Sequence, residues 1–463
     1  MSEKKSEKRQ RLVYTQKNGY DIIEAEEKRG LEAYCSEYIS YLNVARTERE
    51  AVSRAIILAE KKGFKPYTRG MALKKGTKIY FSNRGKALML AVIGRKPLSE
   101  GAVIAAAHVD APRLDLKPNP MYEDSELCYF KTHYYGGIKK YQWTAIPLEL
   151  HGVAALKDGT VVDIVIGRDS GDPQLVITDL LPHLGADQMK KTLADGITGE
   201  GLNLLIGSVP DGEEGSDRVK LAILSLLYEK YGITEEDFLS AELEAVPAFD
   251  VRELGLDRSL IGGYGHDDRV CAFAELKAIF DVKNPERTCV CILADKEEIG
   301  SEGVTGMKSD AFESFMEALC DSQGVKLREC FENSLCISAD VCNGYDPNFP
   351  EVSEKRNNAK LNYGMGICKY TGARGKSGAN DASAETVARL RAAFAKNGVV
   401  WQMAELGKVD QGGGGTVAAY MAERNIDTID AGVPVLSMHA PFETVAKFDC
   451  YMTYKGVLAI YSE

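Results

Sequence analysis

The chain has 463 residues, of which 44% are hydrophobic and 27% are charged, and its formal net charge is −11. This length predicts two or three domains, or one large domain with an insertion. The negative charge argues against nucleic acid and against anionic membrane surfaces as partners.

The charged N-terminal segment, residues 1–14, lacks the apolar centre of a secretory signal. No run approaches the roughly 18 consecutive apolar residues of a membrane span, so we expect a cytoplasmic protein. The 11 cysteines agree with this, because their number is odd and no CxxC pair occurs. Buried free thiols in a reducing compartment are therefore favoured over a disulfide framework or a cysteine metal site.

The first half of the chain changes in character near residue 117. Helical spacing runs through residues 25–62, and residues 78–94 predict two strands and a turn. Residues 101–116 predict a buried strand followed by a functional loop. From there to residue 247, short strands and tight turns dominate, with one amphipathic helix at 217–232.

From about residue 249, predicted strands and helices alternate. This order is typical of a parallel or mixed sheet covered by helices, and it places the chain in the α/β class. We therefore expect a core made of residues 1–116 and 248–463, interrupted by an inserted β-rich domain of residues 117–247.

Potential metal ligands follow four of the apolar strands. The segments are AAAHVD, CILADKEE, CISAD and VLSMH, and they place His108, Glu297 with Glu298, Asp340 and His439 at or just after strand ends. In open α/β sheets, ligands bind beyond the carboxyl ends of strands. These side chains could therefore converge although they are far apart in sequence.

Two of these motifs have a spacing that suits metal chemistry. His108 and Asp110 are two residues apart, so in a strand Asp110 could orient the imidazole; a core histidine with a capping aspartate is the alternative. Glu297 and Glu298 repel each other unless a cation lies nearby. One could bind that cation while the other accepts a proton from water, and a solvated acidic turn is the alternative.

Asp267 and Asp268 open a predicted helix, where aspartate is favoured as a cap. A carboxylate there could instead bridge two cations. Asp340 and His439 are, taken singly, more often structural. Together, however, two histidines and three carboxylates, with a spare glutamate and an orienting aspartate, form a ligand set for a dinuclear site that suits Zn²⁺, Co²⁺ or Mn²⁺.

At these motifs the chain resembles the M18 family of metallo-aminopeptidases, whose best-known members are aspartyl aminopeptidases. The matching segments, in the family's order over nearly the whole chain, are AAHVDAP, HDDRVCAF, DKEEIGSEG, SADVCNGYDPNF and GGGGTVAAYMAERN…VPVLSMHAPFE. The resemblance implies an α/β/α zinc-peptidase core with a mixed, mainly parallel sheet, split by a β-rich lid or dimerisation domain. It also implies a homo-oligomer, a dodecamer built from dimers.

The resemblance further implies a division of the ligands between two ions. His108, Asp340 and one carboxylate would hold one ion, His439 and Glu298 would help to hold the other, and Asp267 would bridge them.

Further roles follow from the same resemblance. Glu297 would be the general base, and Asp110 would orient His108. His183, in LLPHLG of the inserted domain, looks like the histidine that reaches into a neighbouring subunit's active site. Lys369, in MGICKYTG, matches a substrate-binding lysine of aspartyl-specific relatives.

Three departures weaken the expectation of a strict preference for acidic residues. Asn343 stands where close eukaryotic relatives carry a substrate-binding histidine, and Ala111 replaces a serine. The stretch TGARGKSGAN is longer than its counterpart.

The sequence therefore predicts a two-metal aminopeptidase that removes one residue at a time from the N-terminus of peptides. A related dinuclear deacylase or carboxypeptidase, and a non-catalytic shell-forming homologue, are the alternatives. The glycine loop GGGGT lacks the Lys-Ser/Thr of a P-loop and the spacing of GxGxxG, so nucleotide binding is not expected.

Overall fold

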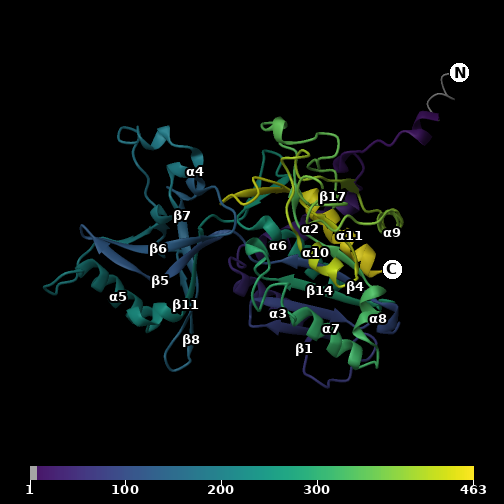
Figure 1. Cartoon of the computed structure of the whole chain (residues 1–463), viewed down its shortest axis with the longest axis horizontal. Coiled ribbons are helices and arrows are strands. Elements are labelled where there is room, and N and C mark those ends of the chain that lie inside the picture. The colour runs from purple at the N-terminus through teal and green to yellow at the C-terminus, as the bar shows by residue number, and fades with distance from the viewer. Residues whose placement is uncertain (1–7) are drawn as a thin grey trace.

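The computed structural model describes residues 8–463; the first seven residues of the charged N-terminal segment lie outside the described range. In Figure 1 the blue and teal middle of the chain forms a β-rich part that projects from a larger core. The core is built from the purple, green and yellow segments, which come from both ends of the chain.

The core contains a nine-stranded sheet in the order β1-β2-β3-β14-β4-β15-β19-β17-β18. Its strands are β1 (Lys65–Pro66), β2 (Lys78–Asn83), β3 (Ala87–Val92), β4 (Ala102–His108), β14 (Thr288–Ala294), β15 (Leu335–Ser338), β17 (Met365–Cys368), β18 (Trp401–Met403) and β19 (Asp427–Gly432). The four central strands β14, β4, β15 and β19 run parallel to one another. Antiparallel pairings join this group to β3 on one side and to β17 on the other.

Helices cover both faces of this sheet. The odd-numbered residues 103–107 of β4 belong to one apolar cluster and the even-numbered residues 102–106 to another, as expected for a strand buried on both sides. The helices packed in the first cluster are α2 (Ala25–Leu42), α3 (Glu48–Lys61), α6 (His266–Asp281), α9 (Ala384–Asn397) and α11 (Lys447–Tyr461). Those in the second are α7 (Ala311–Asp321), α8 (Leu327–Glu332) and α10 (Val417–Glu423). The predicted α/β class, with a mixed and mainly parallel sheet, is confirmed.

The start of α3 shows how local sequence sets an element. The Thr47 hydroxyl oxygen accepts the backbone N–H of Glu50, and the Glu50 carboxylate accepts the backbone N–H of Thr47. This capping box satisfies two backbone donors that a helix terminus otherwise leaves free.

The projecting part is a second sheet of seven strands. They are β5 (Arg113–Asp124), β6 (Leu127–Tyr135), β7 (Pro147–Ala155), β8 (Val161–Ile166), β9 (Leu175–Val176), β10 (Leu204–Gly207) and β11 (Ala241–Pro247). Because β11 pairs with both β5 and β7, the sheet closes on itself. The same part contains α4 (Leu193–Gly196) and α5 (Arg218–Tyr231).

One expectation about this region is wrong. Residues 113–116 were expected in a loop after β4, but they begin β5 and pair with β6. The apolar and polar residues alternate there, as in a strand with one buried face, so only a short turn separates the two sheets.

A third, five-stranded sheet was not foreseen. Its strands are β12 (Arg252–Leu254), β13 (Leu260–Gly263), β16 (Cys342–Asn343), β20 (Pro434–Leu436) and β21 (Glu443–Ala446). The strand expected to end at His439 is β20, so it lies in this sheet and stops three residues earlier.

All 11 cysteines are buried and unpaired, in agreement with the free thiols predicted from sequence. Among the helices of residues 8–463, none combines the length and the apolar character needed to cross a membrane.

Candidate metal centre

Three of the predicted motifs meet at one edge of the central sheet. His108 is the last residue of β4, whose parallel neighbours are β14 and β15. The chain after β14 forms the short 3-10 helix η7 (Glu297–Ile299), and Asp340 lies two residues beyond β15. Because parallel neighbours end on the same side, these strands carry their polar residues to a common edge.

Asp267 lies between two imidazoles. Its Oδ1 is 3.3 Å from Nε2 of His108, and its Oδ2 is 3.2 Å from Nε2 of His439. The residue is near the start of α6, but its φ of −79° and ψ of 107° are not helical. The predicted first helical turn is therefore distorted here, and the carboxylate faces both histidines.

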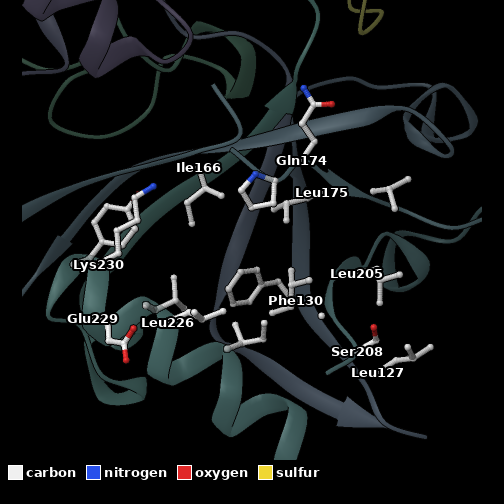
Figure 2. Close-up of a pocket in the computed structure, with 17 residues that line it drawn as sticks. Leu127, Phe130, Ile166, Gln174, Leu175, Leu205, Ser208, Leu226, Glu229 and Lys230 are labelled. Carbon is white, nitrogen blue, oxygen red and sulfur yellow. The ribbon is translucent and has the colours of Figure 1, made fainter. Parts of the chain in front are cut away.

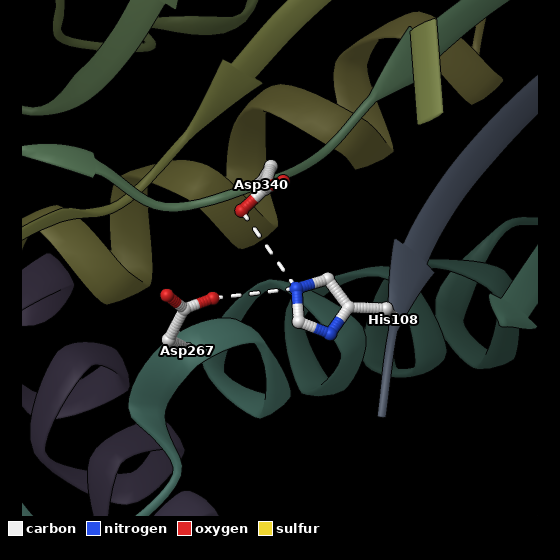
Figure 3. Close-up of side chains that lie close together, drawn as sticks. All are labelled: His108, Asp267 and Asp340. Atoms are coloured by element: carbon white, nitrogen blue, oxygen red, sulfur yellow. Dashed lines mark ion pairs between the residues drawn. The ribbon is translucent and has the colours of Figure 1, made fainter. Parts of the chain in front are cut away.

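These contacts define two groups of metal-ligating atoms that share Asp267. The first group is His108, Asp267 and Asp340, with 4.0 Å between Nε2 of His108 and Oδ1 of Asp340 (Figure 3). The second is Asp267, Glu298 and His439, with 3.6 Å between Nε2 of His439 and Oε2 of Glu298. Within each group the ligand atoms lie within 4.8 Å of one another.

Glu297 stands beside the first group but does not belong to either group. Its Oε2 is 3.8 Å from Nε2 of His108. Burial raises the pKa of Glu297 to about 7. Its carboxylate therefore faces the cluster from outside both sets of ligands.

The cluster holds more negative than positive groups. Burial raises the pKa of Glu298 and of Asp340 well above the ordinary range. The Oε1 atom of Glu298 is buried and has no hydrogen-bond partner among the described residues. Buried carboxylates of this kind are costly without a compensating charge, so the site fits divalent cations ligated by imidazole and carboxylate.

Both histidines turn the same nitrogen toward the cluster. Nδ1 of His108 lies 3.0 Å from the backbone oxygen and 3.3 Å from Oδ1 of Asp110, as the H-x-D spacing predicted. Nδ1 of His439 lies 2.7 Å from the backbone oxygen of Gly137. A carbonyl oxygen can only accept, so each Nδ1 donates a hydrogen, and Nε2 is the nitrogen of each ring that faces the other ligand groups and could bind a cation.

Glu443 was missed in the sequence. It is 2% exposed, and its carboxylate accepts the backbone N–H of His439 at 2.7 Å and that of Asp267 at 3.1 Å. It therefore ties together the chain on both sides of the second group. The only hint in the sequence was its position in APFE, four residues after His439. In a turn between two strands, however, the spacing of residues does not predict which of them are in contact.

Two further predicted site residues, His183 and Lys369, do not belong to either ligand group. His183 is exposed in the second sheet's loops, and Lys369 pairs with Asp381 at 3.5 Å. Among residues 8–463, no hydrogen bond or ion pair joins either residue to the two ligand groups. Asn343 ends β16, where its backbone oxygen accepts a hydrogen bond from Asn358.

A separate apolar groove of about 740 Å³ lies in the second sheet, between α5 and the strands (Figure 2). Phe130, Leu175 and Leu226 are among its lining residues, all of which fall between residues 127 and 231. None of the metal-ligand candidates contributes to this groove, so its shape does not serve the chemistry of the cluster.

The chain is similar to known proteins over nearly its whole length. A family model described as Aminopeptidase I zinc metalloprotease (M18) matches residues 41–461. A probable M18 family aminopeptidase 1 of Clostridium acetobutylicum is 48% identical over 458 residues, which cover 97% of this chain and 98% of the relative.

Solved structures share the fold. That of an M18-family aminopeptidase of Thermotoga maritima has a TM-score of 0.93 and 44% identity, and the match covers 97% of this chain and 100% of the other. The S. cerevisiae mApe1 structure, described as a dodecamer, has a TM-score of 0.76 at 21% identity, with 94% and 98% covered. At that identity the likeness concerns the fold alone.

Proposed function

Since the chain belongs to the M18 family of zinc metalloprotease aminopeptidases, we propose that it removes single residues from peptide N-termini with two divalent ions in one cluster. The observation that carries the proposal is the position of Asp267. Its two carboxylate oxygens lie 3.3 and 3.2 Å from two different imidazoles. A carboxylate placed in this way is suited to bridge two cations.

The two ligand groups would each hold one ion, with Asp267 in both. His108 and Asp340 would complete one site, and Glu298 and His439 the other. Imidazole and carboxylate ligation suits Zn²⁺, and Co²⁺ or Mn²⁺ would also fit. When bound, the ions would polarise the peptide carbonyl and lower the pKa of a water molecule.

Glu297 would carry the proton in this reaction. It lies next to the first ligand group, 3.8 Å from Nε2 of His108, and its carboxylate is left free by both groups. It would take a proton from the attacking water as the new C–O bond forms. It would then give that proton to the leaving amine as the C–N bond breaks. The excess of carboxylates around it would favour substrates with a free amino terminus.

Glu297→Gln tests this role, because the amide keeps the shape of the side chain but cannot accept the proton. Turnover should fall by about 10²–10⁴-fold, while two zinc ions per chain are retained. Glu302→Gln is a matched control in the following turn, where Glu302 is exposed and pairs with Lys308. Near-normal turnover of Glu297→Gln, or loss of zinc from it, would contradict the assignment.

We also place His183 and Lys369 at the substrate site and propose that acidic N-terminal residues are favoured. The Lys369 side chain is 38% exposed and its contact with Asp381 is long, so it can exchange that partner for a substrate carboxylate. In a metal-supplemented screen of aminoacyl substrates, Lys369→Met should lose activity selectively on substrates with an acidic N-terminal residue. Cleavage of N-acylated substrates alone would instead indicate a deacylase.

His183 would reach its site in another copy of the chain. It lies in a loop region with five exposed apolar side chains, each at least half exposed: Leu180, Leu181, Leu184, Met189 and Leu193. A surface of this kind is typical of a protein interface. We therefore propose a homo-oligomer of dimers, in which twelve copies assemble as described for the yeast protein.

The chain would be organised as a peptidase core of residues 1–116 and 248–463 around an inserted domain of residues 117–247. The unpaired, buried cysteines support a reducing compartment, the cytoplasm.

A further inference from the structure

The segment Tyr135–Gly137 leaves the second sheet beside the metal centre. Tyr135 is the last residue of β6 and pairs with Arg113, the first residue of β5. Gly136 and Gly137 follow, before the chain continues to β7. The sequence predicted only a strand end and a tight turn at this point, yet three contacts connect the segment with the ligand groups.

The first contact is made by the tyrosine hydroxyl. Tyr135 donates a hydrogen bond to Oδ2 of Asp110 over 2.8 Å. The same carboxylate accepts the backbone N–H groups of Glu297 and Glu298 at 3.1 and 3.2 Å, and its Oδ1 lies 3.3 Å from Nδ1 of His108. Asp110 therefore holds one histidine and the η7 turn together, and Tyr135 holds Asp110.

The second and third contacts are made by the two glycines. The backbone oxygen of Gly137 accepts the hydrogen of Nδ1 of His439 over 2.7 Å. Gly136 has a φ of +74°, and a Cβ there would lie 3.3 Å from Cβ of Glu298. The missing side chain thus allows the segment to pass close to a ligand of the second group.

The tyrosine ring contacts an arginine that is itself paired with both the second sheet and the core. The Arg113 guanidinium lies over the ring of Tyr135, 3.9 Å from its centre. Arg113 also contacts Glu244 of β11 at 3.2 Å and Glu48 of α3 at 3.3 Å. The position of the hydroxyl therefore depends on both the second sheet and the core.

We propose that Tyr135–Gly137 is a positioning segment that sets the orientation of both metal-binding histidines from the second sheet, through Asp110 for His108 and directly for His439. A metal-bound imidazole needs an acceptor at its other nitrogen to fix its tautomer and direction. One short segment supplies or supports that acceptor for both rings. The proposal rests on the proposed function, because it takes the two histidines as ligands.

Tyr135→Phe tests the proposal with the loss of one oxygen atom. The ring and its contact with Arg113 remain, but Asp110 loses a donor. Tyr134→Phe is the matched control on the same strand, because Tyr134 is 42% exposed and its side chain lies near Gly199 rather than near the cluster.

Both variants and the wild type are purified without metal. Zinc affinity is measured by competition with a chelating indicator. The constants kcat and KM are measured after zinc is restored, and thermal unfolding is measured on the metal-free forms. Tyr135→Phe should bind zinc about 10–100-fold more weakly and lose kcat by a similar factor, with KM within about twofold of wild type. Tyr134→Phe should match the wild type in all of these.

A second variant, Gly136→Ala, tests the glycine contact. The added methyl group must displace Glu298 or the segment itself, so zinc affinity of one of the two sites should fall while the metal-free protein still unfolds cooperatively.

Equal zinc affinity and kcat in Tyr135→Phe and Tyr134→Phe would overturn the positioning role. The role would also be overturned if the lower zinc affinity and kcat of Tyr135→Phe were accounted for by a lower unfolding temperature of its metal-free form. The proposed function fails separately, if the wild type itself binds no zinc and cleaves no aminoacyl substrate.

Discussion

Asp267→Asn is the substitution that most directly addresses the shared carboxylate. The amide keeps one oxygen and replaces the other with an NH₂ group, which cannot bind a cation. Whichever way the amide turns, one of His108 and His439 loses the oxygen that now lies 3.3 or 3.2 Å from its Nε2. The variant should therefore keep at most one tightly bound zinc ion.

The magnitude follows from the lost charge. One carboxylate charge divided between two divalent ions attracts each ion as strongly as two unit charges attract each other, which is about 4 kcal/mol at about 4 Å and an effective dielectric constant of about 20. Since 1.4 kcal/mol corresponds to a factor of ten, the affinity for the weaker zinc ion should fall by about a thousandfold. Asp267 is only 3% exposed, so solvent screens this loss weakly.

The assay is zinc stoichiometry by elemental analysis after dialysis against a weak chelator, followed by titration with a fluorescent zinc indicator. Asp281→Asn, at the other end of α6, is the control, because within residues 8–463 Asp281 pairs only with lysines and Tyr454. Two zinc ions per chain with unchanged affinity in Asp267→Asn would refute the bridging role.

Three further outcomes are expected. Burial opposes a charged His151 ring, but Glu149 and Glu50 outweigh it and raise the pKa of His151 above its ordinary 6.5. The stability that the charged ring contributes is therefore complete below about pH 6.5, and it is lost as the pH rises through the raised pKa. His151→Gln should therefore lower the unfolding temperature more at about pH 6 than at about pH 9; an equal effect at both would contradict this. Arg46→Met removes the nearest charged partner of the buried Glu149 carboxylate, at 2.7 Å, and leaves it only the longer contacts with His151 and Arg168. The variant should cost about 3 kcal/mol in denaturant unfolding, and a loss below about 1 kcal/mol would show that the pair matters little. Leu184→Glu places a charge on a side chain that is 70% exposed and should reduce the oligomer mass in light scattering, and an unchanged mass would argue against an interface there.

The sequence was informative where one rule governed both fold and site. The apolar strands before His108 and Asp340 are parallel neighbours in one sheet, so the rule that ligands gather at strand ends located both residues. The same rule does not reach His439, because β20 belongs to the third sheet. The sequence nevertheless marked His439 at the end of the apolar segment VLSMH, although it is the third sheet that brings this residue to Asp267.

The supporting contacts were out of reach for a different reason. Gly137 and His439 are 302 residues apart in the sequence, and their contact uses a backbone oxygen. Every residue has such an oxygen, so the residue type at position 137 does not reveal the contact. Tyr135 meets Asp110 across 25 positions and between two sheets, and a tyrosine at a strand end is equally common in a packed core. The closure of the second sheet by β11 likewise depends on pairings between strands more than 80 residues apart.

The burial of all 11 cysteines has a practical consequence for probing this molecule. Thiol-reactive dyes find no accessible native target in the folded chain, because a sulfur must reach solvent to react. A single engineered thiol, for example Leu184→Cys, would then carry the whole fluorescent signal. Its protection from labelling as the protein concentration rises would report when that loop becomes covered, without any need to remove the native cysteines.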